Sequence, residues 1–261
     1  MLELYHSEPN VYFLKPLIAL EEARVPFTSR YFDPTSFEQY SPRFPQNTES
    51  MLQLEREGPV LVDGGTVLTS SFFILEYLAE ANANANLLPG DALGRYRARA
   101  WGQFNALQLA PGVCALGCAR YLAPSLKARD QGQLRARIER LEPQERRAAW
   151  TAVIDGSYDE PTLAKIRERL AMPVKRIESA LGASRWLAGD AYSIADIDAF
   201  ALLAPLPELA PEWVSERTTP RITEFLRTVR ARPAVEKALA HARTPNPQQA
   251  FVPGAEPSRW G

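Results

Sequence analysis

The sequence contains few of the residues that build metal centres and disulfide frameworks. It has only two cysteines, Cys114 and Cys118, and two histidines, His6 and His241, among 261 residues. The spacing of the cysteines matches neither a CxxC redox pair nor a zinc site. The histidines offer no pair suited to metal binding or acid–base chemistry. We therefore predict two small buried thiols and no metal site.

The sequence also lacks long apolar runs and an excess of charge of either sign. No window approaches the roughly 18 uninterrupted apolar residues of a membrane helix, and residues 1–10 contain no basic region leading into an apolar stretch. The 30 Lys and Arg residues nearly match the 31 Asp and Glu residues, giving a formal net charge of -1. The Arg-rich stretch 127–147 contains acidic residues throughout, which favours a solvated helical excursion over a nucleic-acid-binding arm. We expect a cytoplasmic protein that binds neither nucleic acid nor a membrane.

Strand and helix patterns alternate in the first part of the chain. Residues 2–5 and 27–32 are typical of strands, and apolar residues recur at helical spacing between them. The helix is expected to begin near Tyr12 or Phe13, because Pro16 is tolerated only in its first turn. A short strand–helix–strand crossover of this kind joins two parallel strands.

A hairpin and a further helix follow this crossover. Residues 59–63 and 66–69 are rich in strand formers and flank Gly64-Gly65. Glycine supplies the positive φ that tight hairpin turns need, so these runs predict an antiparallel pair. Ser70 or Ser71 then caps a helix that has apolar residues on one side. The N-terminal part thus has the order βαβ followed by ββα.

The rest of the chain is predicted to be helical. Helical periodicity returns after a linker-like stretch rich in Asn and Ala, and no strand pattern recurs before a proline-rich tail. The fold class is therefore α/β plus all-α. The predicted parts are a strand-containing domain over 1–82, a linker over 83–93, an all-helical domain over 94–245 and an irregular tail over 246–261.

The stretch WLAGDAYSIADI, residues 186–197, is the most diagnostic motif. Ser193 followed three residues later by Asp196 predicts a capping box, in which each side chain satisfies a free N–H at a helix start. Together with the βαβ–ββα half, the Ser70-Ser71 junction and Arg232-Pro233-Ala234, this motif resembles the glutathione transferase superfamily. The resemblance implies a thioredoxin-like, glutathione-binding domain, a helical substrate domain, glutathione as co-substrate, and a dimer formed through the two domains of opposite subunits.

Two further segments are similar to the bacterial glutathione-dependent β-etherases, which cleave lignin-derived aryl ethers. They are LKPL at residues 14–17 and FDPTSFEQYS at residues 32–41, and the likeness extends over most of the chain. The resemblance implies that a glutathione thiolate displaces a phenolate from the β-carbon, which lies next to a benzylic ketone. Such an enzyme acts mainly through positioning and electrostatics.

The resemblance places the thiolate-facing position at Tyr12 and Phe13. A polar pair is usual there in the β-etherases, so Phe13 removes a hydroxyl donor from this chain. Tyr12 is the candidate catalytic residue, because its phenol O–H can donate to the thiolate. Alternatively, the two aromatic side chains only pack.

Two other parts of the implied glutathione site are also altered. Gly58 precedes the strand-opening Pro59, and its backbone can pair with the cysteinyl part of glutathione. Additional residues between 44 and 54 fall where the glycine end of glutathione would lie. The γ-glutamyl end is usually held by an acidic residue and a serine, whereas this chain has Ser70-Ser71 and lacks the carboxylate. Ser71 can still bind an anion at a helix N-terminus, or both serines serve only as N-caps.

Aromatic side chains are the candidates for the substrate pocket. Phe13, Trp101 and Tyr121 are expected to face an aromatic substrate, although each is also an ordinary core candidate. Three functions stay open on the sequence alone. The chain is an active β-etherase, a weakly active or non-catalytic subunit that forms a heterodimer with a related subunit, or a general glutathione transferase for aromatic electrophiles. For an active enzyme, a homodimer is equally compatible with the sequence.

Overall fold

A four-stranded sheet with the order β2-β1-β3-β4 forms the base of the N-terminal half. The computed structural model describes residues 1–45, 57–142, 144–156 and 158–254. Strand β1 (Leu2–His6) runs parallel to β2 (Phe27–Tyr31) and antiparallel to β3 (Val60–Asp63), which pairs with β4 (Thr66–Thr69). Gly64 and Gly65 have φ values of 55° and 91°, which are the left-handed values that a tight hairpin turn requires. The predicted parallel pair and the hairpin are both confirmed.

Helix α1 (Val11–Ala23) packs against α2 (Ser71–Ala81) and against helices of the C-terminal half. Its residues 11–20 are all buried, so tertiary packing supports the helix along most of its length. Because α1 begins at Val11, Pro16 lies beyond the first turn, and its expected place within that turn is wrong. Proline removes one backbone donor at this point, and burial on all sides holds the helix despite that loss.

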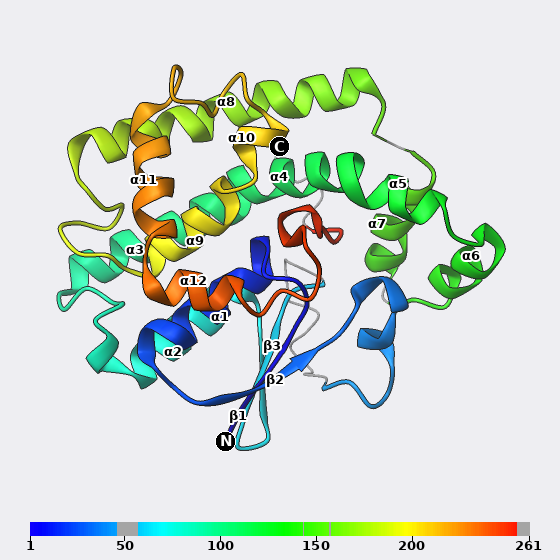
Figure 1. Cartoon of the computed structure of the whole chain (residues 1–261), viewed down its shortest axis with the longest axis horizontal. Coiled ribbons are helices and arrows are strands. Elements are labelled where there is room, and N and C mark those ends of the chain that lie inside the picture. Colours follow the sequence, from blue (N-terminus) through cyan, green and yellow to red (C-terminus); the bar gives the residue numbers. More distant parts are fainter. Residues whose placement is uncertain (46–56, 143, 157, 255–261) are drawn as a thin grey trace.

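From residue 83 on, the described chain consists of helices and loops, apart from an isolated β-bridge between Trp186 and Gly189. Figure 1 shows this helical half above the sheet, with α8 spanning the top of the view. A thioredoxin-like sheet with its helices, followed by an all-helical half, is the architecture that the sequence predicts. The helical segments are α3 (Ala92–Phe104), η5 (Asn105–Leu109), α4 (Ala110–Gly117), η6 (Cys118–Leu122), α5 (Ala123–Lys127), α6 (Gln131–Glu139), α7 (Gln144–Ile154), α8 (Glu160–Ala183), α9 (Ile194–Leu203), α10 (Leu206–Leu209), α11 (Pro220–Arg230) and α12 (Pro233–Leu239), with short 3-10 turns at η1 (Pro34–Ser36), η2 (Glu38–Tyr40), η4 (Ala83–Ala85) and η7 (Pro247–Gln249).

Helices α3, α4 and α5 join end to end through η5 and η6, two π-helical turns, to give one helical run over Ala92–Lys127. Among the described residues, this run is the one helix long and apolar enough to cross a membrane by length and composition. However, 61% of its most apolar window is buried inside the protein, as in the core helix of a folded domain. The π turns widen the helix locally, a feature that is frequent at functional sites.

The predicted capping box is present at the start of α9. The Ser193 hydroxyl accepts from the Ala195 N–H at 3.3 Å, and the Asp196 carboxylate accepts from the Ser193 N–H at 2.9 Å. The second Asp196 oxygen accepts from the Leu187 N–H at 2.9 Å, which ties the preceding loop to the helix. Burial raises the pKa of Asp196 to about 6, against the lowering effect of these hydrogen bonds. The capping box therefore fixes a helix start deep in the core.

Candidate functional site

Tyr12 and Phe13, at the start of α1, point toward different halves of the protein. The Tyr12 phenol oxygen accepts from the Cys114 thiol of α4 at 3.3 Å, so this side chain faces the helical half. Phe13 packs edge-to-face on Phe32 at a centroid distance of 5.8 Å, so its ring lies against the N-terminal half. Both side chains are buried. Val11, just before them, has a φ of 42°, which is a strained value for a β-branched residue.

A cavity of about 380 Å³ lies beside Tyr12 and brings together residues from distant parts of the sequence. Tyr12 and Lys15 line it from α1, and Ser70 lines it at the start of α2. The two predicted site residues Tyr12 and Ser70 therefore meet at one hollow. Its remaining lining residues are Phe72, Phe73, Glu76, Arg99, Gly102, Gln103, Ala106, Leu107, Ala110 and Asp198.

A buried ion pair forms one wall of this cavity. The Lys15 ammonium lies 2.7 Å from the Asp198 carboxylate, and the two side chains are only 3% and 2% exposed. The Asn105 amide donates to the second Asp198 oxygen at 2.8 Å, and the Lys15 ammonium lies 5.2 Å from the centroid of the Tyr12 ring. The pair links α1 to α9, and so joins the two halves of the protein next to Tyr12.

Sequence reasoning assigned no role to Lys15, Asp198 or Asn105. The signal was present, because Lys15 is the one charged residue in the apolar run 11–20, and Asp198 lies in the apolar helix after the capping box. Charged residues are almost never fully buried unless they are paired. A buried lysine in one helix and a buried aspartate in another therefore predict an ion pair between them.

Ser70 and Ser71 occupy the junction between β4 and α2. Ser70 stands at the N-cap position with φ 70° and ψ 115°, and its side chain makes no cap hydrogen bond. Ser71 is the first residue of α2 and is completely buried. The predicted helix start is therefore confirmed, but of the two expected caps Ser70 holds the N-cap position without the side-chain hydrogen bond of a cap. A non-glycine residue at positive φ costs free energy and is a frequent feature of binding sites.

Gly58 and Pro59 are buried directly before β3. The preceding residue, Glu57, is also buried, and its carboxylate accepts from the Gln39 amide at 2.9 Å, from the Trp150 indole N–H at 3.2 Å and from the Tyr40 hydroxyl. These contacts tie the loop before Pro59 to α7 of the helical half. Burial, together with the Glu57 carboxylate, raises the pKa of Tyr40. Residues 54–56 and the extra loop expected before them lie outside the described residues.

The other predicted pocket residues lie apart from one another. Trp101 packs edge-to-face on Phe104 at 5.5 Å and lines a different hollow, beside Met172 and Lys175 of α8. Tyr121, in η6, stacks on Phe251 at a centroid distance of 6.0 Å and an interplanar angle of 17°. Phe251 belongs to the C-terminal segment, which returns between α1 and α4 (Figure 1). Tyr121 therefore lies beside the C-terminal segment, whereas Trp101 lies beside α8.

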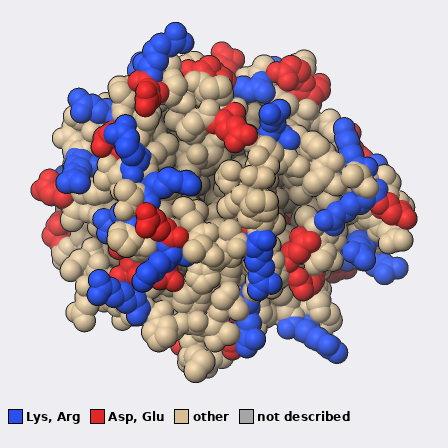
Figure 2. Space-filling model, in the orientation of Figure 1, with Lys and Arg blue, Asp and Glu red and all other residues tan. Residues whose placement is uncertain are grey.

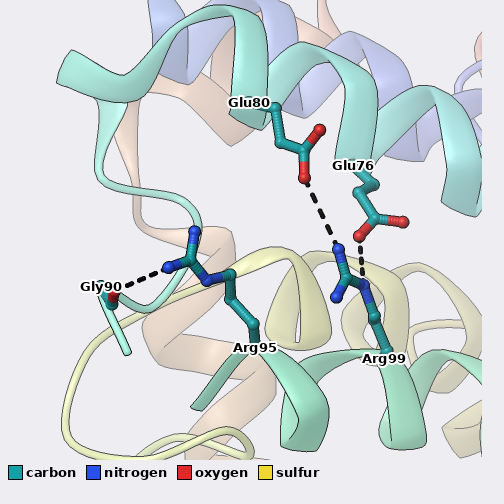
Figure 3. A network of polar contacts seen from close by, with 5 residues as sticks. All are labelled: Glu76, Glu80, Gly90, Arg95 and Arg99. Atoms are coloured by element: carbon teal, nitrogen blue, oxygen red, sulfur yellow. Dashed lines mark hydrogen bonds and ion pairs between the residues drawn. The ribbon is translucent and has the colours of Figure 1, made fainter. Parts of the chain in front are cut away.

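Helices α2 and α3 face each other at the edge of the cavity (Figure 3). Arg99 donates to Glu76 at 2.5 Å, and a second nitrogen of its guanidinium lies 3.5 Å from Glu80. Arg95, one turn earlier on α3, donates instead to the Gly90 carbonyl at 2.9 Å. Because Arg99 is half-exposed, its ion pairs add little to stability, and they serve mainly to keep the two helices in register.

The charged groups at the surface are of both signs. Figure 2 shows Lys and Arg interspersed with Asp and Glu around the visible face, with uncharged residues across its middle. Within the described ranges, no three His, Cys, Asp or Glu side chains are grouped so as to hold a metal ion. The features that distinguish the site are the buried Lys15–Asp198 pair and the positive φ values of Val11 and Ser70.

Two family models match this chain. The glutathione S-transferase N-terminal domain matches residues 1–80, and the glutathione S-transferase C-terminal domain matches residues 134–233. The first range contains the sheet, α1 and all but the last residue of α2, and the second contains the capping box of α9. The chain belongs to the glutathione S-transferase family, whose co-substrate is glutathione.

Within this family, the chain is similar to a β-etherase over nearly its whole length. Protein LigF of Sphingobium sp. strain SYK-6 is 26% identical over 248 residues, which are 93% of this chain and 94% of LigF. The crystal structure of beta-etherase LigF from that strain matches with a TM-score of 0.83 over 92% of this chain and 99% of that chain. A tetrachloro-p-hydroquinone reductive dehalogenase of Sphingobium chlorophenolicum is 24% identical, over 91% of this chain and 95% of the dehalogenase. The fold is also that of a glutathione transferase family member from Pseudomonas fluorescens with two glutathione bound, at 22% identity and a TM-score of 0.67 over 91% of this chain and 92% of that chain.

Proposed function

We propose that this protein is a glutathione-dependent enzyme that cleaves β-aryl ether bonds in lignin-derived aromatic compounds. The observation that supports this function is the likeness to LigF, which spans nearly the full length of both chains in sequence and in fold, at 26% identity. A glutathione-dependent enzyme needs reduced glutathione, which is kept in the cytosol. We therefore place the protein in the cytoplasm.

The proposed reaction is a displacement at carbon. The glutathione sulfur, as thiolate, forms a bond to the β-carbon of the side chain, which is directly attached to the benzylic ketone, and the bond from that carbon to the aryl oxygen breaks. The departing phenolate takes the electron pair and is then protonated by water, which leaves a glutathione thioether. The protein must keep the thiol ionised near neutral pH, and each unit by which it lowers the thiol pKa corresponds to about 1.4 kcal/mol of preference for the thiolate.

We assign the thiolate contact to Tyr12. Its phenol lies at the start of α1, faces the helical half and already contacts the Cys114 thiol at 3.3 Å. The Gly58 backbone beside Pro59 would pair with the cysteinyl part of glutathione. Ser70-Ser71, at the N-terminus of α2, would receive the γ-glutamyl carboxylate, because the positive end of a helix dipole favours an anion.

The aromatic part of the substrate is assigned to the side of Tyr121. This ring lies in η6, directly after α4, and α4 carries the Cys114 thiol that contacts the Tyr12 phenol. Phe13 packs on Phe32 instead, and Trp101 lines the hollow beside α8. An aryl group near Tyr121 would therefore lie on the same side of α1 as the proposed thiolate.

A second function is favoured by the departures at this site. Phe13 packs on Phe32 where the related pattern has a polar group, and Ser70 stands where that pattern has a carboxylate. A weakly active or non-catalytic chain with these features would act as one subunit beside a related, active subunit. The face formed by α2, α3 and η5 suits such a heterodimer, or a homodimer, because large apolar side chains lie exposed on it. They are Phe73, Tyr96 and Leu107, with exposed fractions of 66%, 66% and 41%.

A turnover assay with the purified chain tests both functions. Phenacyl phenyl ether is incubated with glutathione, and the released phenol is measured. We expect release by the chain alone, and replacement of glutathione by S-methylglutathione, which has no free thiol, should abolish it. Release only after a related subunit is added selects the subunit function, and no release under either condition rejects ether cleavage. Chloronitrobenzene in the same assay detects general conjugation of aromatic electrophiles.

The role of Tyr12 is tested by removing its hydroxyl alone. Tyr12→Phe should lower kcat at neutral pH by at least about tenfold and leave KM for the ether nearly unchanged, because the lost donor keeps bound glutathione ionised as thiolate and does not hold the ether. Tyr192→Phe removes a hydroxyl from another buried ring, packed on Trp186, and should leave kcat unchanged. Full activity of Tyr12→Phe would rule out the assignment.

A further inference from the structure

The C-terminal segment 247–254, which we call the C-terminal strap, lies across the start of α1. The Asn10 side-chain amide, just before α1, donates to the Gln248 carbonyl at 3.2 Å and to the Ala250 carbonyl at 2.9 Å. Asn10 is only 5% exposed, so the strap covers it. Figure 1 shows the strap in red between α1 and α4, and α12, the last α-helix before it, ends at Leu239.

Phe251 of the strap is buried in a recess shaped for an aromatic ring. The ring is 4% exposed and stacks on Tyr121. The ring also lies against Gly117 of α4. A Cβ atom added to Gly117 would lie 2.2 Å from the nearest ring carbon, so a larger residue there would collide with the ring. Helix α4 therefore has no side chain at the point where the ring lies, and η6 offers an aromatic face beside it. The recess therefore holds a flat ring between a glycine and an aromatic face.

The end of the strap reaches the phenol that we assign to the thiolate. A Cβ added at Gly254 would lie 2.7 Å from the Tyr12 hydroxyl and 2.8 Å from the Cys114 sulfur. Residues 251–254 are all buried. The strap therefore fills the cleft between α1 and the α4–η6 run, from the aromatic recess to Tyr12.

The strap is held by interactions that can be released without dismantling the fold. Within the described chain it contains one 3-10 turn and contributes to no sheet and no long helix. Among the described residues, the side-chain hydrogen bonds that join it to the rest of the protein come from Asn10. Segments with few hydrogen bonds open locally at low cost, while the rest of a protein remains folded. An incoming ring would also replace the buried Phe251 ring with similar apolar contact.

We infer that Phe251 occupies the aryl-binding subsite of this protein, and that the C-terminal strap must withdraw from the Gly117–Tyr121 recess before an aromatic substrate binds. The inference rests on the proposed function for the identity of the ligand as an aryl ether. The recess itself follows from Phe251, Gly117 and Tyr121 alone. Access to the cleft beside Tyr12 is then set by competition between two aromatic rings, one from the chain and one from the substrate.

A reversible lock tests the strap directly. The Cβ of Gly254→Cys would lie 3.2 Å from the Cys114 Cβ, a few tenths of an ångström below the range of about 3.5–4.5 Å that disulfides span. Oxidation with diamide should therefore fasten the strap, and tris(carboxyethyl)phosphine should free it. Peptide mapping by mass spectrometry confirms the pairing. Gly254→Ser, which cannot cross-link, is the matched control.

Binding of phenacyl phenyl ether is measured by calorimetry without glutathione, so that turnover plays no part. The oxidised Gly254→Cys protein should bind at least about tenfold more weakly than the reduced form, and Phe251→Ala should bind about tenfold more tightly than the wild type. Adding Gly117→Val to Phe251→Ala should remove that gain, because the new side chain fills the recess. Equal binding by oxidised and reduced protein, or no gain in Phe251→Ala, would overturn the inference.

Two further outcomes separate this inference from the proposed function. If the lock controls binding of the ether but no phenol is released with glutathione, ether cleavage fails and the aromatic recess stands. If phenol is released but the lock and Phe251→Ala change nothing, ether cleavage stands and the role of the strap fails. Should Gly254→Cys not pair with Cys114, the comparison of Phe251→Ala with the conservative Phe251→Tyr decides, because only the ring-deleting variant should gain affinity.

Discussion

Two buried regions meet at Tyr12, and they are built from different interactions. On one side, Lys15 and Asp198 join α1 to α9 through an ion pair whose side chains are 3% and 2% exposed. On the other side, Phe251 of the C-terminal strap is 4% exposed and is held by apolar contact. A buried charge has no alternative partner when it is separated from its counterion, whereas an apolar ring can be exchanged for another ring. Although the two regions are equally buried, we expect the Lys15–Asp198 pair to stay in place and the Phe251 ring to be displaceable.

Breaking the Lys15–Asp198 ion pair should give the largest loss in the free energy of unfolding. Asp198→Ala should destabilise the protein by about 3–5 kcal/mol, because Lys15 would stay buried without its counterion. Urea unfolding followed by far-ultraviolet circular dichroism measures this loss. The double variant Lys15→Met/Asp198→Leu removes both charges at similar volume and should recover most of the stability. A double variant as unstable as Asp198→Ala would show that packing, and not the unpaired charge, holds this joint.

Acid should weaken the packing at the end of strand β1, where His6 lies. His6 is completely buried; its Nδ1–H donates to the Ser7 carbonyl at 2.7 Å, and its Nε2 accepts from the Ser29 hydroxyl at 2.7 Å. Burial lowers the pKa of His6 from 6.5 to about 4, against the raising effect of the Ser7 hydrogen bond. Between these values the unfolded chain binds the proton and the folded protein does not, so stability is full above pH 6.5 and falls as the pH falls toward 4.

The loss that His6 causes should be about 3 kcal/mol over that interval. It is measured as the difference in urea unfolding between the wild type and His6→Gln at several pH values, which cancels the contribution of the other titrating groups. The two proteins should diverge in their pH dependence below pH 6.5. Parallel curves would mean that His6 does not control acid stability.

Truncation of the strap aromatic should give the smallest change in global stability. Phe251→Ala should lower the free energy of unfolding by about 1 kcal/mol or less, because the strap can detach while the core stays folded. Phe200→Ala is the matched control, since Phe200 is 1% exposed in α9 and its loss from the core should cost about 3–5 kcal/mol. Urea midpoints of the two variants provide the measurement. Similar losses in both would make the strap part of the core.

Local signals in the sequence predicted most of the fold. The Gly64-Gly65 hairpin and the Ser193–Asp196 capping box are formed by residues close together in the chain, so short patterns identify them. The start of α1 was harder to predict. Proline propensity alone put Pro16 in the first turn, but the burial of residues 11–20 overrides that preference. Propensity is a weak guide where a helix is packed on all sides.

The candidate site could be predicted only in part. The resemblance led to Tyr12 and Ser70, which line one cavity. It gave no indication that Phe13 would turn toward Phe32 or that Glu57 would accept from Trp150 of α7. These contacts join residues far apart in the sequence, and no local periodicity encodes them.

The sequence by itself determined the order of strands and helices, the hairpin turn and the capped start of α9, because these depend on backbone conformation and on neighbours a few residues away. The tertiary structure alone decided that Lys15 would meet Asp198, and that Phe251 would return across the start of α1 to lie between Gly117 and Tyr121. Burial and pairing at long range depend on how whole elements pack, so only the folded chain shows which charge is fixed and which ring can be displaced.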